Sequence, residues 1–361
     1  MDYEQILKEQ MGNVIEPGQA EAISDEAARL SEGLTDTFTL HDIMEAAIDG
    51  KSIFNSNELI DGLKTLMIYE VRAALVLGVE ILIICIVTGL LKNLSSSFGK
   101  KSVSDISMLV CTMIIIGISI NSFRLAYNLA IDSVTTMVNT MEILTPVLLG
   151  ILISTGSIAS GTIMSPLMIG TVTGTGIILK KIILPAMFAA SILALINCLT
   201  EKDYVNKLSR LIRNTSVAIT GLAMALLSGI ISVQGLITDA SDGLLINTAK
   251  YSLSTFIPIV GGFTADTAEL FIKCMSTIKN IVGVFGIITL VLVILVPIIK
   301  LLIIALIYKI TAAAAEPICD SKISDTLNDM GSCIVSLGAV MFFASLLFII
   351  FIGVIVGMGG G

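Results

Sequence analysis

The sequence predicts an all-α protein that crosses a membrane several times and carries a small hydrophilic region at its N-terminus. Of its 361 residues, 55% are hydrophobic and only 14% are charged, whereas a soluble protein carries roughly 25% charged residues. The mean hydropathy is +0.96, and the apolar residues gather in runs of about 20, the length that a helix needs to cross a bilayer. Lipid therefore surrounds most of the chain, and the runs predict about seven transmembrane helices, within a range of roughly five to nine.

Charge divides the chain into two regions, residues 1–70 and residues 71–361. The first region holds 15 acidic and 4 basic side chains, while the second holds 14 acidic and 17 basic ones. We therefore expect an acidic helical region at 1–70 and a transmembrane domain at 71–361. Neither region carries the clustered positive charge that nucleic acid binding requires, so nucleic acid is not an expected partner.

The first 70 residues predict short amphipathic helices, separated by Pro17-Gly18, Gly33 and the loop 50–57. Two acidic residues follow Ser24, a pattern that is typical of the first turn of a helix. A region of this length with few aromatic residues makes only a marginal core of its own. We expect it to lean on the membrane part or on a partner rather than to form a catalytic domain.

Apolar runs and their interruptions place the individual spans. The stretch 143–178 has no charged residue but many glycines and prolines, so it predicts a helical hairpin or two half-helices, which lipid tolerates only against protein or a wet cavity. The segment 251–264 is only about 14 residues long and predicts a re-entrant segment or half of a span. Asp132 and Glu142 predict an outer stretch between two spans. The remaining spans are expected at about 73–92, 106–126, 182–199, 215–237, 281–310 and 334–357.

The short loop 92–101 sets the expected orientation in the membrane. It carries three lysines, and short loops rich in Lys and Arg face the cytoplasm. The acidic N-terminal region then lies outside the cytosol, and because the sequence starts without a signal-peptide pattern, this orientation implies that a leader has been removed. The basic loop 200–213 is also expected in the cytosol, whereas the acidic stretch 316–329 is expected outside.

Prolines and glycines recur at a fixed distance and predict an internal duplication. Five matched positions, among them Gly117 and Gly229, are offset by the same 112 residues. The two repeats would be 102–213 and 214–325, followed by the last span at 334–357. The other four pairs are Pro146/Pro258, Gly150/Gly262, Gly174/Gly286 and Pro185/Pro297.

The broken apolar stretches supply the candidate functional positions. One interpretation is that they line a pore or a substrate path, because transporters place broken helices at matched positions of two repeats. The other interpretation, which we favour, is tight helix packing through small residues. These candidates are Pro146, Gly150, Pro166, Gly174, Pro185, Pro258, Gly261, Gly262, Gly286 and Pro297.

Glu80 and Lys300 are the candidate charges inside the membrane, since each interrupts an apolar run. A charge in hydrocarbon costs roughly 2.5–3.5 kcal/mol on insertion scales, so such side chains usually face protein or water. The two residues could line a conduit. Alternatively, they lie near bends or reach the membrane surface with their long side chains, and we favour this second interpretation.

The sequence carries no signature of an enzyme. His41 is the only histidine, and the six cysteines form no C-x-x-C pair, which disfavours a metal site. No phosphate-binding P-loop is present. We therefore expect no catalytic residue, no cofactor and no metal site.

Three stretches resemble the stage III sporulation protein AE family of endospore-forming bacteria. They are 251–263, which reads Tyr-Ser-Leu-Ser-Thr-Phe-Ile-Pro-Ile-Val-Gly-Gly-Phe, 144–149, which reads Leu-Thr-Pro-Val-Leu-Leu, and 315–318, which reads Ala-Glu-Pro-Ile. The hydrophilic N-terminal region, the order of spans and the Met-Gly-Gly end are similar too. The resemblance therefore covers nearly the whole chain.

The resemblance implies a multi-pass protein of the mother-cell-derived outer forespore membrane. There it would be a core subunit, similar to an export gate or a permease, of the channel or secretion complex between mother cell and forespore that endospore formation requires. The implied partners are the other sporulation AA–AH membrane proteins, the forespore protein Q and membrane lipid, and a second copy of the chain stays open. The family supplies no catalytic residues.

Two other functions stay open at this point, a stand-alone secondary transporter of a small solute and a structural membrane scaffold. A large exposed apolar or small-residue face on the monomer would favour assembly with partners. A closed cavity at the membrane midplane with convergent polar groups would favour a carrier.

Overall fold

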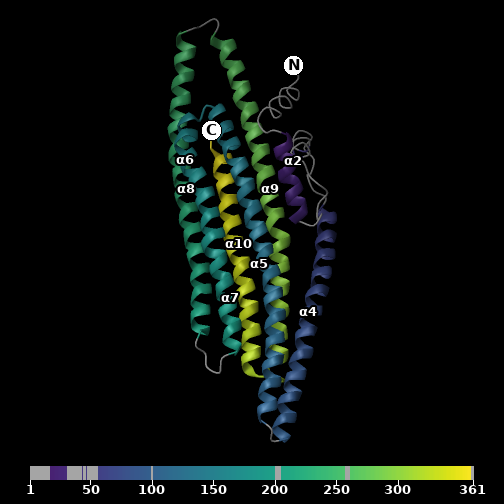
Figure 1. The fold of residues 1–361 in the computed structure, drawn as a ribbon. Coiled ribbons are helices and arrows are strands. Elements are labelled where there is room, and N and C mark those ends of the chain that lie inside the picture. The colour runs from purple at the N-terminus through teal and green to yellow at the C-terminus, as the bar shows by residue number, and fades with distance from the viewer. Residues whose placement is uncertain are drawn as a thin grey trace.

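The chain forms a bundle of long helices, seen in a computed structural model that describes residues 17–30, 43, 46, 56–98, 101–199, 205–256 and 261–358 (Figure 1). All the regular elements within these residues are helical, which confirms the predicted all-α class. The elements are α2 (Pro17–Leu30), α4 (Ser56–Phe98), α5 (Lys101–Ser154), α6 (Ile158–Ile178), the π-helix η1 (Leu179–Ile183), α7 (Leu184–Leu199), α8 (Asn206–Phe256), α9 (Gly261–Ala315) and α10 (Ser321–Gly357).

Six helical segments in the described part of the chain are long and apolar enough to cross a membrane, so the chain is a multi-pass membrane protein. Six lies within the predicted range. The outer stretch predicted at Asp132 and Glu142 does not interrupt the helix, because α5 continues through both residues, and its position relative to the membrane stays a prediction. The stretch 121–142 contains many polar residues, but it includes neither Pro nor Gly, so nothing in it breaks the helix. The six segments are Ile60–Leu91, Ile106–Ser154, Ser160–Leu199, Asn206–Gly235, Ile272–Ala315 and Ser321–Gly357.

The predicted hairpin in 143–178 is confirmed, and its turn lies between α5 and α6. Gly156 has a φ of 92°, in the left-handed region that glycine enters without steric cost. The Thr155 hydroxyl donates to the carbonyl of Leu152 at 2.7 Å, which satisfies one of the carbonyls left open at the end of α5. The chain then returns along α5 as α6.

Prolines do not interrupt the long helices where the sequence led us to expect breaks. Helices α5, α6 and α9 run through Pro146, Pro166 and Pro297, as transmembrane helices can when neighbouring groups satisfy the freed carbonyl. Pro185 instead follows the π-helix η1, in which the Leu184 N–H donates to the carbonyl of Leu179. Because proline has no N–H to continue the α-helical ladder, the bonding shifts by one residue there, and α6, η1 and α7 form one continuous rod.

Helices α9 and α10 form the centre of the bundle, and α5, α7 and α8 pack around α10 (Figure 1). Large side chains of α9 and α10, among them Phe285, Tyr308 and Phe348, are fully buried between them and their neighbours. Helix α4 lies against α9 and α5. Its Gly78 permits close approach, because a Cβ there would lie 2.7 Å from Cγ2 of Ile307 on α9.

The turns lie at two opposite ends of the bundle (Figure 1). The last residues of α4, α7 and α9 and the first residues of α5, α8 and α10 lie toward one end, and the α5–α6 turn, α2 and the C-terminal end of α10 lie toward the other. The expected cytosolic position of 92–101 and the expected outer position of 316–329 are therefore incompatible, because a Cβ at Gly89, near the end of α4, would collide with the carbonyl of Ile318 in the α9–α10 turn. Orientation follows Lys and Arg rather than Asp and Glu, which favours the cytosolic position of 92–101, and the orientation of the chain stays a prediction.

Candidate functional site

Lys300 lies inside the bundle and forms an ion pair with Glu70. Its Nζ is 3.0 Å from Oε1 of Glu70, and the side chains are only 16% and 13% exposed. The pair joins α9 to α4, so Lys300 has a charged partner within the protein. Glu70 was not a candidate in the sequence, because it falls in the region 1–70 predicted to be hydrophilic, whereas α4 begins 14 residues earlier, at Ser56.

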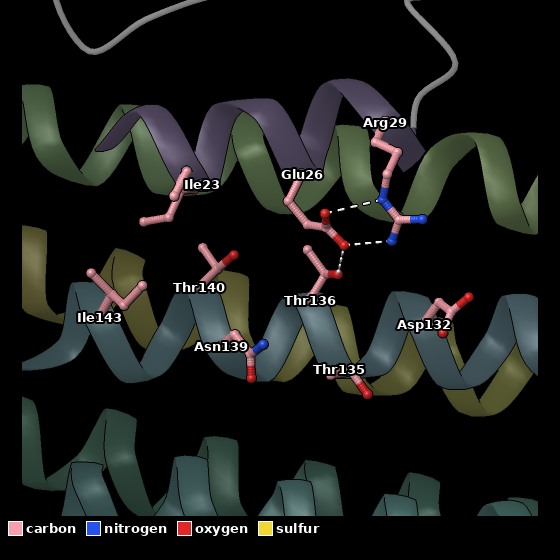
Figure 2. A pocket seen from close by; sticks show the side chains of 10 residues that line it. Ile23, Glu26, Arg29, Asp132, Thr135, Thr136, Asn139, Thr140 and Ile143 are labelled. Atoms are coloured by element: carbon pink, nitrogen blue, oxygen red, sulfur yellow. Dashed lines mark hydrogen bonds and ion pairs between the residues drawn. The ribbon is translucent and has the colours of Figure 1, made fainter. Parts of the chain in front are cut away.

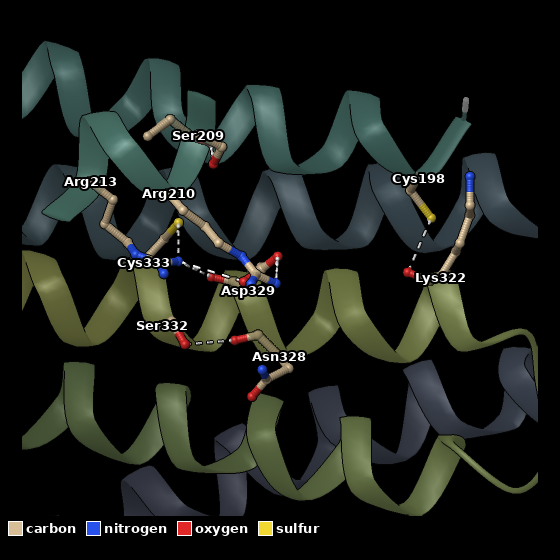
Figure 3. Close-up of polar contacts among 10 residues, drawn as sticks. Cys198, Ser209, Arg210, Arg213, Lys322, Asn328, Asp329, Ser332 and Cys333 are labelled. Carbon is tan, nitrogen blue, oxygen red and sulfur yellow. Dashed lines mark hydrogen bonds and ion pairs between the residues drawn. The ribbon is translucent and has the colours of Figure 1, made fainter. Parts of the chain in front are cut away.

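A second cluster of charges joins α8 to α10 (Figure 3). The Asp329 carboxylate, 7% exposed, lies 3.2 Å from the Arg210 guanidinium and 3.8 Å from that of Arg213. Arg213 also donates to the Asp329 carbonyl at 3.4 Å and lies 3.8 Å from the Cys333 sulfur. The single Asp329 carboxylate offsets part of the charge of two guanidinium groups across the α8–α10 contact, so the cluster joins these two helices.

Lys279 on α9 is fully buried. Its ammonium donates to the backbone carbonyl of Met358, the residue that caps the C-terminal end of α10. A cation at a helix C-terminus binds the last carbonyls and complements the helix dipole. The contact fixes the depth of α9 relative to α10, and nothing in the local sequence pattern around Lys279 predicts it.

Glu80 differs from these charges because its side chain is exposed on the outer face of α4. Its neighbours on that face are apolar, with Val76, Val79 and Ile83 exposed by 61%, 51% and 56%. A carboxylate in such a position is costly in lipid. The face of α4 around Glu80 is therefore a candidate contact surface.

The proline and glycine candidates of the first predicted repeat lie mostly on the outside of the bundle. Pro146 and Gly150 lie one turn apart on the exposed face of α5, and Pro166 and Pro185 are exposed on α6 and α7. Gly174 is half-buried, and a Cβ there would meet nothing within 4 Å. Small size is not required for helix packing at Gly150 or Gly174.

Two candidates of the second predicted repeat, Gly286 and Pro297, are buried in α9. Pro297 lies in the interior, and a Cβ at Gly286 would lie 2.7 Å from Leu144 on α5 and 2.9 Å from Ile352 on α10. Gly286 therefore serves close packing, as a small residue does at a membrane helix interface. Pro258 lies outside the described residues, and Gly261 and Gly262 are the first residues of α9.

The structure does not bring these candidates together at one point. Gly174 and Pro185 lie toward the outside of α6 and α7, whereas their predicted counterparts Gly286 and Pro297 lie inside the bundle. The internal duplication stays a prediction.

A pocket of about 300 Å³ lies between α2 and the middle of α5 (Figure 2). Glu26 on α2 pairs with Arg29 at 2.5 Å and accepts a hydrogen bond from the Thr136 hydroxyl at 3.2 Å. The hydrogen bond with Arg29, followed by the charge of that guanidinium, holds the pKa of Glu26 below its usual value. Further polar residues of α5 that line the pocket are Asp132, Thr135, Asn139 and Thr140.

Comparison with known proteins identifies the family of this chain. Residues 38–359 match the family described as stage III sporulation protein AE. The chain belongs to that family. Stage III sporulation protein AE of Bacillus subtilis (strain 168) is 30% identical over 315 residues, which cover 86% of this chain and 78% of that relative. No solved structure matches the chain.

The stage III sporulation protein AE family is named for sporulation rather than for a reaction, and the resemblance found in the sequence is confirmed. This member is thus a multi-pass sporulation protein. The family match includes α4 to α10, which hold both interhelical ion-pair clusters, the buried lysine and Glu80, but it leaves out α2. The polar pocket at α2 therefore combines one element outside the family match with one inside it.

Proposed function

We propose that this chain is a membrane-core subunit, similar to an export gate or a permease, of the channel or secretion complex between mother cell and forespore. In this proposal the chain lies in the mother-cell-derived outer forespore membrane, with its acidic N-terminal region outside the cytosol. Its partners are the other sporulation AA–AH membrane proteins and the forespore protein Q. Family membership supports the sporulation role, and the structure supports the role as a subunit.

The exposed carboxylate of Glu80 is the observation that carries this proposal. An isolated subunit would place this side chain in lipid, among large apolar residues such as Val76 and Ile83. A helix of a partner protein with a basic or amide side chain would cover it at a much lower free energy, because intramembrane charges pair with one another or with polar protein groups. Helix α4 is thus suited to contact another membrane protein.

The interior charges argue against a proton-coupled carrier that works alone. Lys300 is paired with Glu70, and Asp329 with two arginines. These pairs join neighbouring helices, so they are structural groups rather than a convergent substrate site. A transporter of the alternative kind would place such groups around a cavity at the membrane midplane.

Photo-crosslinking tests the proposal in sporulating cells. A photoreactive amino acid at Val79 or Ile83 should form adducts with another sporulation membrane protein, whereas the same amino acid at Leu222, 64% exposed on α8, serves as the control and should label only lipid. A Glu80→Lys variant should lower spore counts by at least about tenfold at preserved protein level, because a like-charge contact costs several kcal/mol at an interface.

Two outcomes would reject the proposed role as a subunit. Adducts with lipid alone from both α4 positions would show that this face has no protein neighbour. Normal spore counts for Glu80→Lys would show that the charge of this face has no function. Both results together would favour a stand-alone transporter.

A further inference from the structure

The middle of α5 carries a row of polar side chains on its exposed face. All of them are exposed, and their spacing of three, four or seven residues places them on one face of the helix. This row extends into the pocket beside α2, which Asp132 and Asn139 line. We call it the α5 polar face, and it consists of Asn121, Arg124, Asn128, Asp132, Asn139 and Glu142.

The neighbouring helices are uncharged at the same depth. Val138 of α5 lies beside Gly176, since a Cβ at Gly176 would be 2.9 Å from its Cγ1, and Leu144 lies beside Gly286. Helix α6 has no charged residue, and α9 has none between Lys279 and Lys300. Asn139 and Glu142 therefore lie at a depth where α6 and α9 present only uncharged, mostly apolar residues.

At the same depth, the exposed face of α5 is thus polar and the exposed face of α6 is apolar. On α6, Ile177 is 48% exposed next to Gly176, as expected for a residue that faces lipid. On α5, Glu142 is exposed one turn after Val138. A charged face in hydrocarbon is costly, so such residues within a membrane face protein or a water-filled cavity.

Helix α2 supplies a second, independent observation on the same side. It is a polar helix with three acidic residues, Glu21, Asp25 and Glu26, and one basic residue, Arg29. It packs against α5 and α9. The Glu26–Thr136 hydrogen bond fixes it at the level of the α5 polar face. A helix with this composition is stable in water and not in lipid, so water reaches this side of the bundle.

We propose that the α5 polar face, with α2 beside it, borders an aqueous path through the membrane in the assembled complex, while α6 and α7 face lipid. The path suits water and hydrated small solutes, because its wall offers carboxylate, guanidinium and amide groups rather than charges of one sign. The inference rests on the proposed function, since the opposite wall of the path would come from a partner or from a second copy of the chain.

Cysteine labelling of the assembled complex tests this arrangement with matched pairs at equal depth. In a chain whose native cysteines are replaced, Asn139→Cys on α5 is compared with Ile177→Cys on α6. The second pair is Asn128→Cys on α5 and Ala189→Cys on α7. The depth of this pair is set by the Tyr127 and Phe188 rings, whose centroids are 4.9 Å apart, and all four positions are exposed.

A membrane-impermeant, charged methanethiosulfonate should modify the two α5 cysteines rapidly and the two α6–α7 cysteines roughly a hundredfold more slowly, because the reactive thiolate is disfavoured in lipid to about that extent. Labelling after denaturation measures the total thiol, and the protein level shows whether each variant folds. Rapid labelling of all four positions would place this depth outside the bilayer, and slow labelling of all four would place the α5 face against lipid or protein. Either result would overturn the inference.

The outcome separates this inference from the proposed function. Slow labelling on α5 together with protein adducts from Val79 would remove the aqueous path and leave the role as a subunit. Rapid labelling on α5 alone, without protein adducts from Val79, would support the aqueous face and reject the role as a subunit.

Discussion

The ion pair between Lys300 and Glu70 gives the sharpest test of how buried charges stabilise the helix bundle. Replacing Lys300 with Met keeps the length and volume of the side chain but leaves the Glu70 carboxylate, 13% exposed, without its partner. Breaking a buried pair in this way costs about 3–5 kcal/mol, whereas replacing both charges is often nearly neutral. At roughly 2 °C per kcal/mol for a long chain, the unfolding midpoint of Lys300→Met should fall by roughly 6–10 °C.

Thermal unfolding in detergent, followed with a thiol-reactive dye, measures this effect, since Cys85, Cys111, Cys274 and Cys333 are buried and react only after unfolding. The double variant Glu70→Gln/Lys300→Met should recover most of the lost stability.

An exposed pair on the same helix is the control for this measurement. Lys64 pairs with Asp61 at 3.0 Å, but these side chains are 66% and 74% exposed, and exposed pairs contribute about 0–1 kcal/mol. Lys64→Met should therefore shift the midpoint by roughly 2 °C or less. Equal shifts for Lys64→Met and Lys300→Met would refute the reasoning, because the inner pair would then be as well screened as the outer one.

Three further predictions concern packing, charge and pH. Gly89→Val should lower the free energy of unfolding by about 1–3 kcal/mol, because the larger side chain overpacks against the α9–α10 turn. Gly117→Val is the control, because a side chain there meets open space, and thermal unfolding compares the two variants. Asp329→Asn should lower expression and the unfolding midpoint because it leaves two arginines without their carboxylate, and the exposed Asp325→Asn should change neither. Because Glu26 has a depressed pKa, its stabilisation of α2 is complete above the usual value of 4.5 and disappears as the pH falls through the lower folded value. Proteolysis of α2 should then increase, and Glu26→Gln should remove this pH dependence.

Composition alone predicts the all-α class, and the turn in 143–178 is also readable from sequence. Charged residues predict the end of a helix less reliably than Pro and Gly do. Asp132 and Glu142 interrupt the apolar pattern, yet no Pro or Gly between them stops the helix, whereas Gly156 does stop it. Span counts from hydropathy therefore split helices that are continuous in the structure.

Pairs that join distant segments could not be predicted from one sequence. Glu70 and Lys300 are 230 positions apart, and no local periodicity links them. The same holds for the contact of Lys279 with the C-terminal end of α10. Lys300 stands out in the sequence because charges in apolar runs are rare, but only the fold shows that Glu70 neutralises it.

The contact between Lys279 and Met358 has a geometric consequence for α8 and α9. It marks the end of α10, and α9 begins at Gly261, 18 residues before Lys279, which corresponds to about 27 Å of helix. The upper parts of α8 and α9 thus form an arm that stands clear of the central helix (Figure 1). A protein that binds this arm would contact residues beyond the two candidate spans, which end at Gly235 and resume at Ile272, at the end of the bundle where α2 lies (Figure 1).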